Sequence, residues 1–442
     1  MSLSHSSHRS LGLWVLTALV AGNMIGSGVF LLPSSLAAYG TIGILAWTIT
    51  AIGTIFLALT FARLARIFPK TGGPYAYCRE AYGEFVGFQI AYNYWIAIWV
   101  GNAAIVTAFV GYLTVFWPAL NRDPHLALWV SIGTVWFLTI VNIIGVGVAG
   151  RLQFVATVLK IIPLFIIATV GLFFVHKHNL QAFNVSGKSN WSALSTTATM
   201  TLWSFVGFES GTVPASHVVD PVRNIPRATI IGTIIAAAIY IASTTSIMGI
   251  LPLSALAKSS SPYADAALIM FGSWGSKLVA IGALISCFGT LTGWILIQGQ
   301  IPLGAAEDGL FPKQFARITQ KGVPVFGLVV SSILISLLLI VRYGASLVDQ
   351  FTFIILLATL ASLIPYLYTS VAEVLIYVNN RQQFQTKRFL TSVGLATIGF
   401  VFAFWAIAGA GYQVVFYGLL LMLSAIPIYI WIKWRTPQVQ EK

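Results

Sequence analysis

Charged residues are scarce in this sequence: only 8% of its 442 residues are Asp, Glu, Lys or Arg, whereas 58% are hydrophobic. In soluble globular proteins about a quarter of the residues are charged. Together with a mean hydropathy of +0.88, this composition excludes a soluble protein and predicts a chain that crosses a membrane several times.

Cysteine and histidine are also scarce. Cys78 and Cys287 both adjoin apolar segments and form neither a disulfide framework nor a metal-binding spacing. Of the six histidines, only His217 reaches the end of an apolar run. A hydrolase or metalloenzyme inside a membrane needs Ser, His, Asp or metal-ligating side chains that converge. We therefore predict that the protein is not an enzyme and has no cofactor and no metal site.

The apolar residues are gathered in runs long enough for helices that cross a bilayer, which takes about 20 residues. We predict an all-α membrane protein with twelve transmembrane helices. The first run is too long for the apolar part of a signal peptide, so we interpret it as a retained span. The predicted spans are residues 11–36, 42–66, 86–114, 126–148, 153–175, 193–217, 226–252, 276–304, 325–343, 347–372, 388–409 and 412–432.

The basic residues predict the orientation of these spans, because short cytoplasmic loops are enriched in Lys and Arg. With the N-terminus inside, seventeen of the 24 Lys and Arg residues fall on the cytoplasmic side and six outside, while Lys160 falls within a span. Both termini are therefore predicted to be cytoplasmic. Because the formal charge of +13 is spread over many loops, we predict no nucleic-acid partner.

Two predicted spans contain glycine-rich stretches at corresponding depths: AGNMIGSGVF at residues 21–30 and SFVGFESG at residues 204–211. Glycine destabilises a helix interior by about 1 kcal/mol relative to alanine. Irregular backbone at membrane depth is tolerated only where it is buried or lines a water-filled cavity. We interpret both stretches as breaks beside a cavity, where backbone groups bind the carboxylate and ammonium of an amino acid. Close packing of helices through small residues is the alternative for the first stretch.

One of these broken spans runs outward and the other inward, and each opens a group of five predicted helices. This arrangement predicts two inverted five-helix repeats, which are typical of secondary transporters. The predicted organisation is a cytoplasmic tail at 1–10, a first repeat at 11–175, a second repeat at 193–372, two further helices at 388–432 and a cytoplasmic tail at 433–442.

Several longer motifs resemble a known family. They are GNMIGSGVFLLP, KTGGPYAYCREAYG, YWIAIWVGN, TLWSFVGFES, DPVRNIPRATIIGT and AAEDGLFPKQFARI. These motifs resemble the bacterial basic amino-acid/polyamine antiporters of the amino acid–polyamine–organocation (APC) superfamily, with a pattern closest to the arginine/agmatine antiporters. The resemblance covers nearly the whole chain. It implies a LeuT-like fold with broken first and sixth helices, amino acids and amines as small-molecule partners, and a homodimer in the bilayer.

The resemblance also implies where substrate binds. Backbone in the two broken stretches would hold the α-carboxylate and α-amine, and Trp203 would stack on the substrate side chain by a cation–π contact. Trp294 would lie at the floor of the cavity. The implied stretches are Asn23, Met24, Ile25, Gly26, Ser27 and Gly28 in the first span, and Trp203, Ser204, Phe205 and Val206 in the second.

Further implied residues form a gate and the other end of the pocket. Tyr94, Glu209 and Tyr366 would form an inner gate, Tyr75 matches a position implicated in pH sensing, and Ala97 and Asn102 would line the side-chain end. Without the resemblance, ordinary helix packing is the alternative for Tyr94 and Tyr366. For the tryptophans the alternative is a belt at the membrane interface.

This sequence departs from the arginine/agmatine antiporters in the same pocket. Ile98, Ile105 and Ala358 stand where those proteins have a cysteine, a methionine and a serine. A guanidinium carries five donors and requires acceptors, so the substitutions favour a shorter or neutral substrate side chain. Asn102 and Glu209 keep a cationic substrate compatible with the pocket.

Glu209 is the only carboxylate that falls well inside a predicted span. An ionisable residue at that depth costs on the order of 2.5–3.5 kcal/mol and usually marks a substrate or ion pathway. The residue type and its position therefore predict a functional carboxylate, independently of the family resemblance.

Lys160 is a second ionisable residue inside a predicted span, and here the sequence departs from the arginine/agmatine antiporters, which have a small apolar residue. Nine residues of helix beyond Arg151 place it roughly 14 Å deep in a layer about 30 Å thick. The stretch RLQFVATVLK instead resembles the fifth helix of sodium-independent, proton-coupled relatives, where a lysine replaces a bound sodium ion. A structural pairing with Glu209 is the alternative.

These observations predict a transporter of the bacterial inner membrane. The leading hypothesis is exchange of a basic amino acid (arginine, ornithine or lysine) for its decarboxylated amine by alternating access. The alternative is proton-coupled, sodium-independent uptake of a broader or neutral range of amino acids. A channel would require a repeated filter or ring of charges, which the sequence lacks, whereas a sensor built on a transporter fold stays open.

Overall fold

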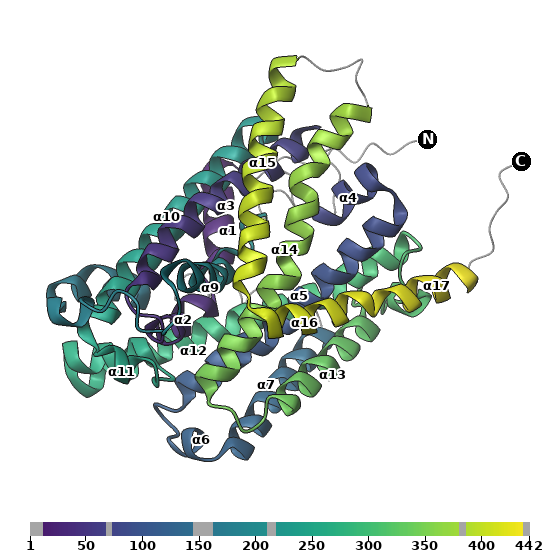
Figure 1. Cartoon of the computed structure of the whole chain (residues 1–442). Coiled ribbons are helices and arrows are strands. Elements are labelled where there is room, and N and C mark those ends of the chain that lie inside the picture. The colour runs from purple at the N-terminus through teal and green to yellow at the C-terminus, as the bar shows by residue number, and fades with distance from the viewer. Residues whose placement is uncertain (1–11, 68–72, 145–161, 210–217, 380–385, 436–442) are drawn as a thin grey trace, which may run out of the picture.

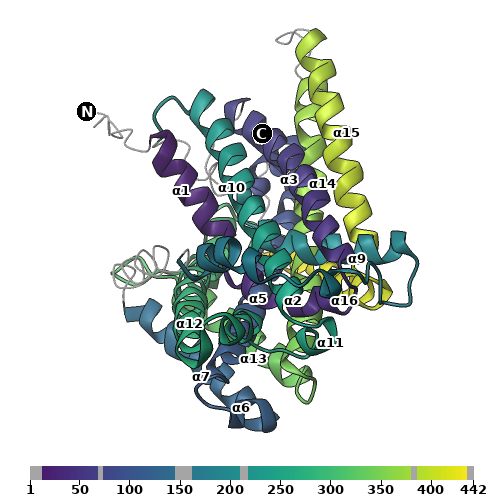
Figure 2. The ribbon, with the colours of Figure 1, turned by 90° about the vertical axis from the view of Figure 1, so that its left-hand side faces the viewer.

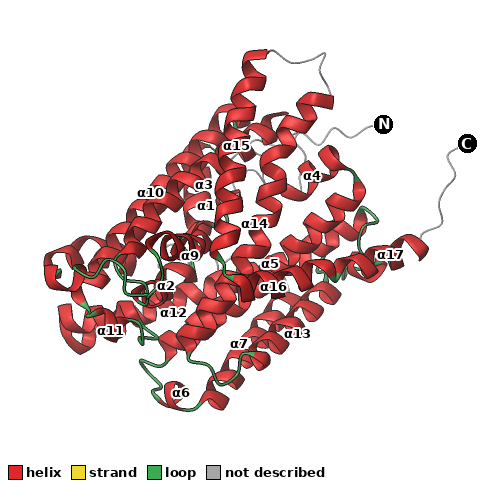
Figure 3. Ribbon diagram, viewed as in Figure 1, coloured by secondary structure: helices red, strands yellow, loops and turns green. Residues whose placement is uncertain are grey.

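The computed structural model describes residues 12–67, 73–144, 162–209, 218–379 and 386–435, and within these ranges the secondary-structure elements are all helical (Figure 3). The α-helices are α1 (Leu13–Met24), α2 (Ser27–Ala37), α3 (Ile42–Ile67), α4 (Pro74–Tyr82), α5 (Glu84–Leu113), α6 (Ala119–Arg122), α7 (Pro124–Ile144), α9 (Asn190–Leu202), α10 (Pro221–Ile250), α11 (Leu253–Leu256), α12 (Pro262–Glu307), α13 (Val325–Val341), α14 (Leu347–Asn379), α15 (Thr386–Gly409), α16 (Tyr412–Leu423) and α17 (Ala425–Arg435). Shorter 3₁₀ turns are η1 (Val170–Phe174), η2 (Lys177–Leu180), η3 (Trp203–Phe205) and η6 (Lys313–Ala316).

Many of these helices have the length and composition of membrane spans. In the described ranges, eight helices are long and apolar enough to cross a bilayer, and the bent pair of α1 and α2 makes up to nine. Large apolar side chains such as Trp129, Phe173 and Leu390 are exposed on the outer faces, where lipid tails would cover them. The predicted all-α membrane architecture is therefore confirmed, while the number of twelve spans stays a prediction.

The helices pack in two groups. One group contains α1, α3, α9 and α10, which contact one another in sequence-distant pairs, and the other contains α5, α7, α12 and α13. Figure 1 shows the first group at the upper left and α7 and α13 at the lower right, and Figure 2 shows the same separation from the side. α2 contacts members of both groups, and α14 packs extensively against α5 while also touching α3 and α9. α2 and α14 therefore connect the two groups.

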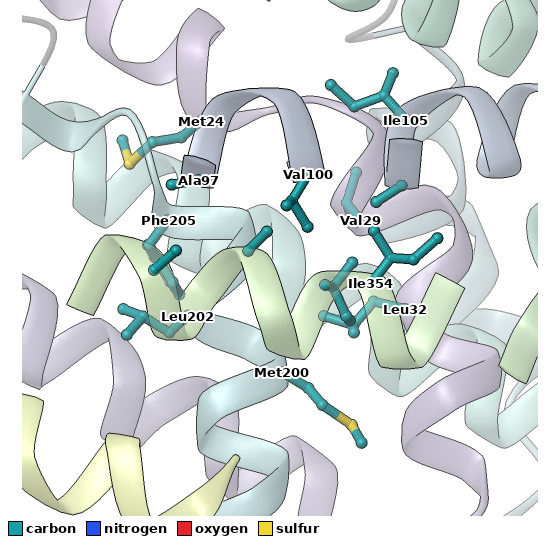
Figure 4. Packing of buried hydrophobic residues seen from close by; sticks show 14 of the residues in the cluster. Met24, Val29, Leu32, Ala97, Val100, Ile105, Met200, Leu202, Phe205 and Ile354 are labelled. Atoms are coloured by element: carbon teal, nitrogen blue, oxygen red, sulfur yellow. The ribbon is translucent and has the colours of Figure 1, made fainter. Parts of the chain in front are cut away.

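Buried apolar side chains fill the interior (Figure 4). Met24 of α1, Ala97 and Ile105 of α5, Phe205 of η3 and Ile354 of α14 are all almost completely buried. Helices from both groups and α14 thus share one apolar core, and the site described below lies within it.

α12 begins earlier than the predicted span 276–304. It starts with Pro262 at its first turn, where a proline costs no hydrogen bond, and continues to Glu307. Gly272, with a φ of +75°, interrupts it near the start. The charge of Asp265 and the break at Gly272 lie before residue 276, where the apolar pattern alone began.

A second buried carboxylate, Glu373, lies just beyond the end of a predicted span. α14 extends beyond the predicted end at residue 372 to Asn379, so that Glu373 lies within it, completely buried. Its Oε1 accepts hydrogen bonds from Nε of Arg63 at 2.9 Å and from Oγ of Ser392 at 2.8 Å. The arginine of α3 balances the charge of Glu373, and neither residue belongs to the site at the helix breaks.

Candidate functional site

The bent helix formed by α1 and α2 is interrupted at its middle. α1 ends at Met24, after which Ile25 leaves the helical region with φ −72° and ψ 90°. Gly26 follows with φ −129° and ψ −149°, and the axes of the two helical segments differ by 44°. Backbone groups at the new helix ends lack intrahelical partners and are available to a ligand.

A second interruption follows α9. The turn η3 ends at Phe205, Val206 is extended with φ −57° and ψ 130°, and Gly207 has a φ of +106°. Glycine adopts this left-handed conformation without steric cost. A Cβ atom on Gly207 would lie 3.4 Å from the carbonyl oxygen of Asn23. The two interruptions are therefore adjacent in the interior.

Two cavities lie against these interruptions. We call the first the head cavity; it is lined by Asn23, Met24, Gly26, Gly28, Ser204 and Thr290. We call the second the tail cavity; it is lined by Tyr94, Ala97, Ile98, Gly101, Asn102 and Ser362. Ile105, Trp203, Val206 and Trp294 line both cavities and so separate one from the other.

Both cavities are small in this conformation. The space for the centre of a water molecule is about 30 Å³ in the head cavity and about 10 Å³ in the tail cavity, and one water needs roughly 10–15 Å³. Each cavity therefore has room for only one or two waters. An amino acid can be accommodated only if the side chains between the cavities move.

The indole of Trp203 lies between two glycines on different helices. A Cβ atom on Gly28 would lie 2.9 Å from Cδ1 of Trp203, at one edge of the ring system. A Cβ atom on Gly101 would lie 2.4 Å from Cη2, at the opposite edge. Both distances are shorter than real Cβ contacts. The position of the indole therefore depends on the absence of a side chain at both residues.

Three buried polar atoms that line the cavities have no hydrogen-bond partner among the described residues. They are Oγ of Ser204 and Oγ1 of Thr290 in the head cavity and Oδ1 of Asn102 in the tail cavity. A buried polar atom without a partner costs about 1–3 kcal/mol, and each one calls for an explanation such as a ligand or an ordered water. Hydrogen-bonding atoms are thus available at both ends of the site.

Glu209 joins two tyrosines from other helices. Its Oε1 accepts hydrogen bonds from the hydroxyl of Tyr94 on α5 at 2.9 Å and from the hydroxyl of Tyr366 on α14 at 3.0 Å. Its Oε2 accepts the backbone N–H of Gly207 at 3.1 Å. Both Glu209 and Tyr366 are almost fully buried. Since Tyr94 also lines the tail cavity, this hydrogen-bonded group closes one side of that cavity.

Comparison with known proteins identifies the family. The sequence profile of the family described as amino acid permease matches residues 11–431. The chain belongs to the amino acid permease family. This permease is 36% identical to the cadaverine/lysine antiporter of Escherichia coli (strain K12) over 411 residues, 92% of this chain and 91% of that protein. It is 33% identical to the putrescine transporter PotE of Haemophilus influenzae over 426 residues, 96% and 97% of the two chains. It is also 32% identical to the putrescine transporter PotE of Escherichia coli (strain K12) over 429 residues, 97% of each chain.

Membership confirms the superfamily that the motifs resemble, and it makes the chain a multi-pass membrane transporter rather than an enzyme. The expected substrate residues of the permease fall largely at the two cavities. Those that line a cavity are Asn23, Met24, Gly26, Gly28, Ala97, Ile98, Asn102, Ile105, Trp203, Ser204, Val206 and Trp294.

Other expected site residues lie elsewhere in the permease. Ile25, Phe205 and Ala358 are buried but line neither cavity. Phe205 packs against the rings of Trp47 and Tyr240 instead. The side chain of Ser27 and the whole of Lys160 lie outside the described residues.

Three residues at the cavities were not predicted to line them: Gly101, Thr290 and Ser362. Ser362 follows Ala358 by one turn of α14, and its hydroxyl donates to the carbonyl oxygen of Ala358 at 3.1 Å. Ser362 therefore brings a hydroxyl oxygen to the wall of the tail cavity, while the hydrogen of this hydroxyl is used by the backbone of Ala358. Gly101 directly precedes Asn102 in the sequence, and its proximity to Asn102 was the only signal that pointed to it.

Tyr75 lies far from both cavities, at the start of α4. Its hydroxyl hydrogen-bonds to the carboxylate of Asp308, which caps the end of α12. The same carboxylate pairs with Arg79 at 3.1 Å. Glu84 lies 3.8 Å from Arg79 and pairs with Lys433 of α17. Charges of alternating sign thus connect α4 with the ends of α12, α5 and α17.

Burial raises the pKa of the Tyr75 hydroxyl well above its usual value, and the Asp308 carboxylate raises it further. The hydroxyl therefore keeps its proton at every physiological pH and can always donate to Asp308. If α4 responds to pH, as the resemblance implies, the change of charge does not belong to Tyr75.

Gly101→Ala is expected to displace the indole of Trp203, because the new methyl group would overlap its Cη2 atom. Overpacking of this kind costs typically 1–3 kcal/mol. We expect a lower melting temperature and substrate affinity reduced about tenfold. Gly133→Ala on α7 is the matched control, since nothing lies within 4 Å of a Cβ atom there. Equal melting temperatures and equal affinities for the two variants would show that Trp203 does not need this slot.

Proposed function

We propose that this permease is a secondary antiporter of the bacterial inner membrane that exchanges a basic amino acid for its decarboxylated amine. The pair of cavities carries this proposal. The head cavity offers backbone and hydroxyl groups at two helix breaks, and the tail cavity offers an amide oxygen beyond an apolar wall. This arrangement suits a ligand with polar groups at both ends of an aliphatic chain. The names of the relatives, a cadaverine/lysine antiporter and putrescine transporters, make lysine with cadaverine and ornithine with putrescine the first pairs to test.

In this proposal the chain has twelve spans, two inverted five-helix repeats (11–175 and 193–372), two further helices and cytoplasmic termini. The eight or nine candidate spans of the described ranges and the corresponding breaks after α1 and α9 support it. The substrate site then lies at the interface of the repeats, where one repeat can rock against the other. The small cavities correspond to a conformation closed around the site.

The proposed binding mode divides the substrate between the cavities. The α-carboxylate and α-amine bind at the helix breaks near Gly26 and Ser204, where amides at a helix N-terminus favour an anion. The aliphatic part passes Ile105 and the indole of Trp203. The terminal nitrogen reaches Asn102 in the tail cavity. The amine product keeps the aliphatic chain and both nitrogens and lacks only the carboxylate, so it keeps the contacts with Ile105, Trp203 and Asn102.

Proton-coupled uptake of neutral amino acids is the second candidate. It is favoured by Ile98 and Ile105 at the cavities and by the fact that, among the described residues, the lining contains no carboxylate. A neutral substrate would leave Oδ1 of Asn102 unsatisfied unless a water remained beside it.

Flux measurements distinguish these functions. Proteoliposomes containing the purified permease are loaded with cadaverine, putrescine, lysine or buffer, and uptake of radiolabelled lysine and ornithine is followed. Antiport predicts fast uptake only with an amine or amino acid inside. Uptake into buffer-loaded vesicles that depends on an imposed proton gradient would instead establish proton coupling, and binding without any flux would identify a sensor.

Trp203→Leu tests the binding mode. Loss of the indole should weaken substrate binding by roughly 1–2 kcal/mol through the lost stacking on the substrate side chain. Trp431→Leu on α17 is the control, because Trp431 lines neither cavity. This variant should bind substrate as the wild type does. Calorimetry gives both affinities; equal values for wild type and Trp203→Leu would remove Trp203 from the site.

A further inference from the structure

The amide of Asn102 takes part in a buried hydrogen-bond chain that continues away from the tail cavity. Its Nδ2 donates to Oε1 of Gln298 on α12 at 2.7 Å. Nε2 of Gln298 donates in turn to Oγ of Ser332 at 3.1 Å and to the carbonyl oxygen of Leu328 at 3.4 Å, both on α13. The side chains of Asn102, Gln298 and Ser332 are completely buried.

The backbone carbonyl of Leu328 determines the orientation of both amides. A carbonyl oxygen can only accept, so Gln298 must present its NH₂ group to α13 and its oxygen to Asn102. The reversed amide would place two acceptors against each other. One N–H of Asn102 then donates to Gln298, and this bond fixes which way the amide is turned. The remaining atom, Oδ1, has no partner among the described residues, and Asn102 lines the tail cavity.

From this geometry we propose that Gln298 is a positioning residue for substrate selection: it holds Asn102 so that a hydrogen-bond acceptor, and not a donor, faces the tail of the substrate. The inference rests on the proposed function and extends it to a residue that lines neither cavity. An acceptor selects a terminal ammonium or amine over a terminal methyl group or carbonyl. A freely turning Asn102 would offer either its oxygen or its NH₂ group and would select much less strongly.

The preference for lysine over norleucine measures this selection, because the two amino acids differ only in the terminal amine. Gln298→Asn keeps a polar group near Leu328 but is one methylene too short to hold Asn102, and Gln298→Met removes the amide altogether. In both variants the dissociation constant of norleucine divided by that of lysine is expected to fall at least tenfold. The fall should come from weaker lysine binding, with norleucine binding unchanged. Ser332→Ala leaves the Leu328 carbonyl in place and should change the ratio less than twofold.

A rescue variant separates positioning from general structural damage. In Gln298→Met combined with Asn102→Asp, either carboxylate oxygen is an acceptor, so the orientation no longer matters and the preference for lysine should return. Two results would overturn the role of Gln298. One is an equal loss of affinity for lysine and norleucine in both single variants, and the other is no recovery of the preference for lysine in the double variant. Failure of the proposed function is distinct, since wild-type permease would then bind none of lysine, ornithine, arginine, cadaverine and putrescine.

Discussion

Glu209→Gln is expected to give a folded permease whose transport no longer varies with pH. A carboxylate only accepts hydrogen bonds, and Glu209 accepts from the hydroxyls of Tyr94 and Tyr366 and from the N–H of Gly207. Glutamine has one acceptor and one donor group. If its oxygen faces the tyrosines, its NH₂ group opposes the N–H of Gly207 and that bond is lost. Hydrogen bonds to a charged group contribute about 1.5–3 kcal/mol each, so the connection between Glu209, Tyr94, Tyr366 and Gly207 is weakened.

Protonation of Glu209 is expected to act on the same hydrogen bonds. Addition of a proton to Glu209 turns one oxygen into a donor and removes the charge that all three partners share. Glu209→Gln imitates this state permanently, and we therefore expect its rate to be nearly constant where the wild-type rate changes with pH. The measurement is lysine–cadaverine exchange at a series of equal internal and external pH values. An unchanged pH profile would identify Glu209 as a purely structural residue.

Two tyrosine variants separate the charge of Glu209 from its hydrogen bonds. Tyr94→Phe and Tyr366→Phe each remove one hydrogen bond and leave the Glu209 carboxylate able to titrate. They should alter the rate of exchange while the shape of the pH profile is retained. If either tyrosine variant flattens the profile as Glu209→Gln does, then the hydrogen bonds and not the charge are responsible.

Much of this architecture could be predicted from the sequence, because its signals are local. A run of about 20 apolar residues specifies a span by itself, and the glycines near Gly26 and Gly207 indicated breaks at the places where the structure has them. The position of Glu209 deep within a predicted span likewise indicated a functional residue.

Residues whose role depends on a partner far along the chain could not be found in this way. Gln298 contacts Asn102 from 196 positions away, and Glu373 meets Arg63 across 310 positions. Nothing in the local sequence of Gln298 or Glu373 reveals these contacts. The role of Gly101 follows from the size of Trp203, which only the packing of α5 against η3 makes apparent.

Lys160→Ala is expected to reduce transport to background while the protein remains in the membrane, and wild-type transport is expected to need no sodium. Lys160 lies outside the described residues, and its sequence position predicts a depth of roughly 14 Å beyond Arg151 along a helix. An ammonium at that depth needs acceptors. On α12, Oγ1 of Thr292 already has a hydrogen-bond partner in the carbonyl of Phe288, whereas Oγ1 of Thr290 is buried and has no partner among the described residues, so Thr290 is the hydroxyl that still requires one.

Thr290 also lies next to the first helix break. A Cβ atom on Gly26 would lie 3.3 Å from Cγ2 of Thr290, and both residues line the head cavity. We propose that the ammonium of Lys160 stabilises the broken helix from this side, as a sodium ion would, and that release of its proton loosens the break. Thr290→Val should then reduce transport several-fold, with Thr292→Val as the control.

The alternative is that Lys160 only balances the charge of Glu209. It predicts that Lys160→Met combined with Glu209→Gln recovers the activity lost in either single variant, because no uncompensated charge would remain. If Lys160 acts as a substitute for sodium, the double variant stays inactive, since the helix break still lacks its cation. Exchange assays with sodium or choline as the only added cation complete the test: a requirement for sodium, or normal flux in Lys160→Ala, would refute the substitution of sodium by lysine.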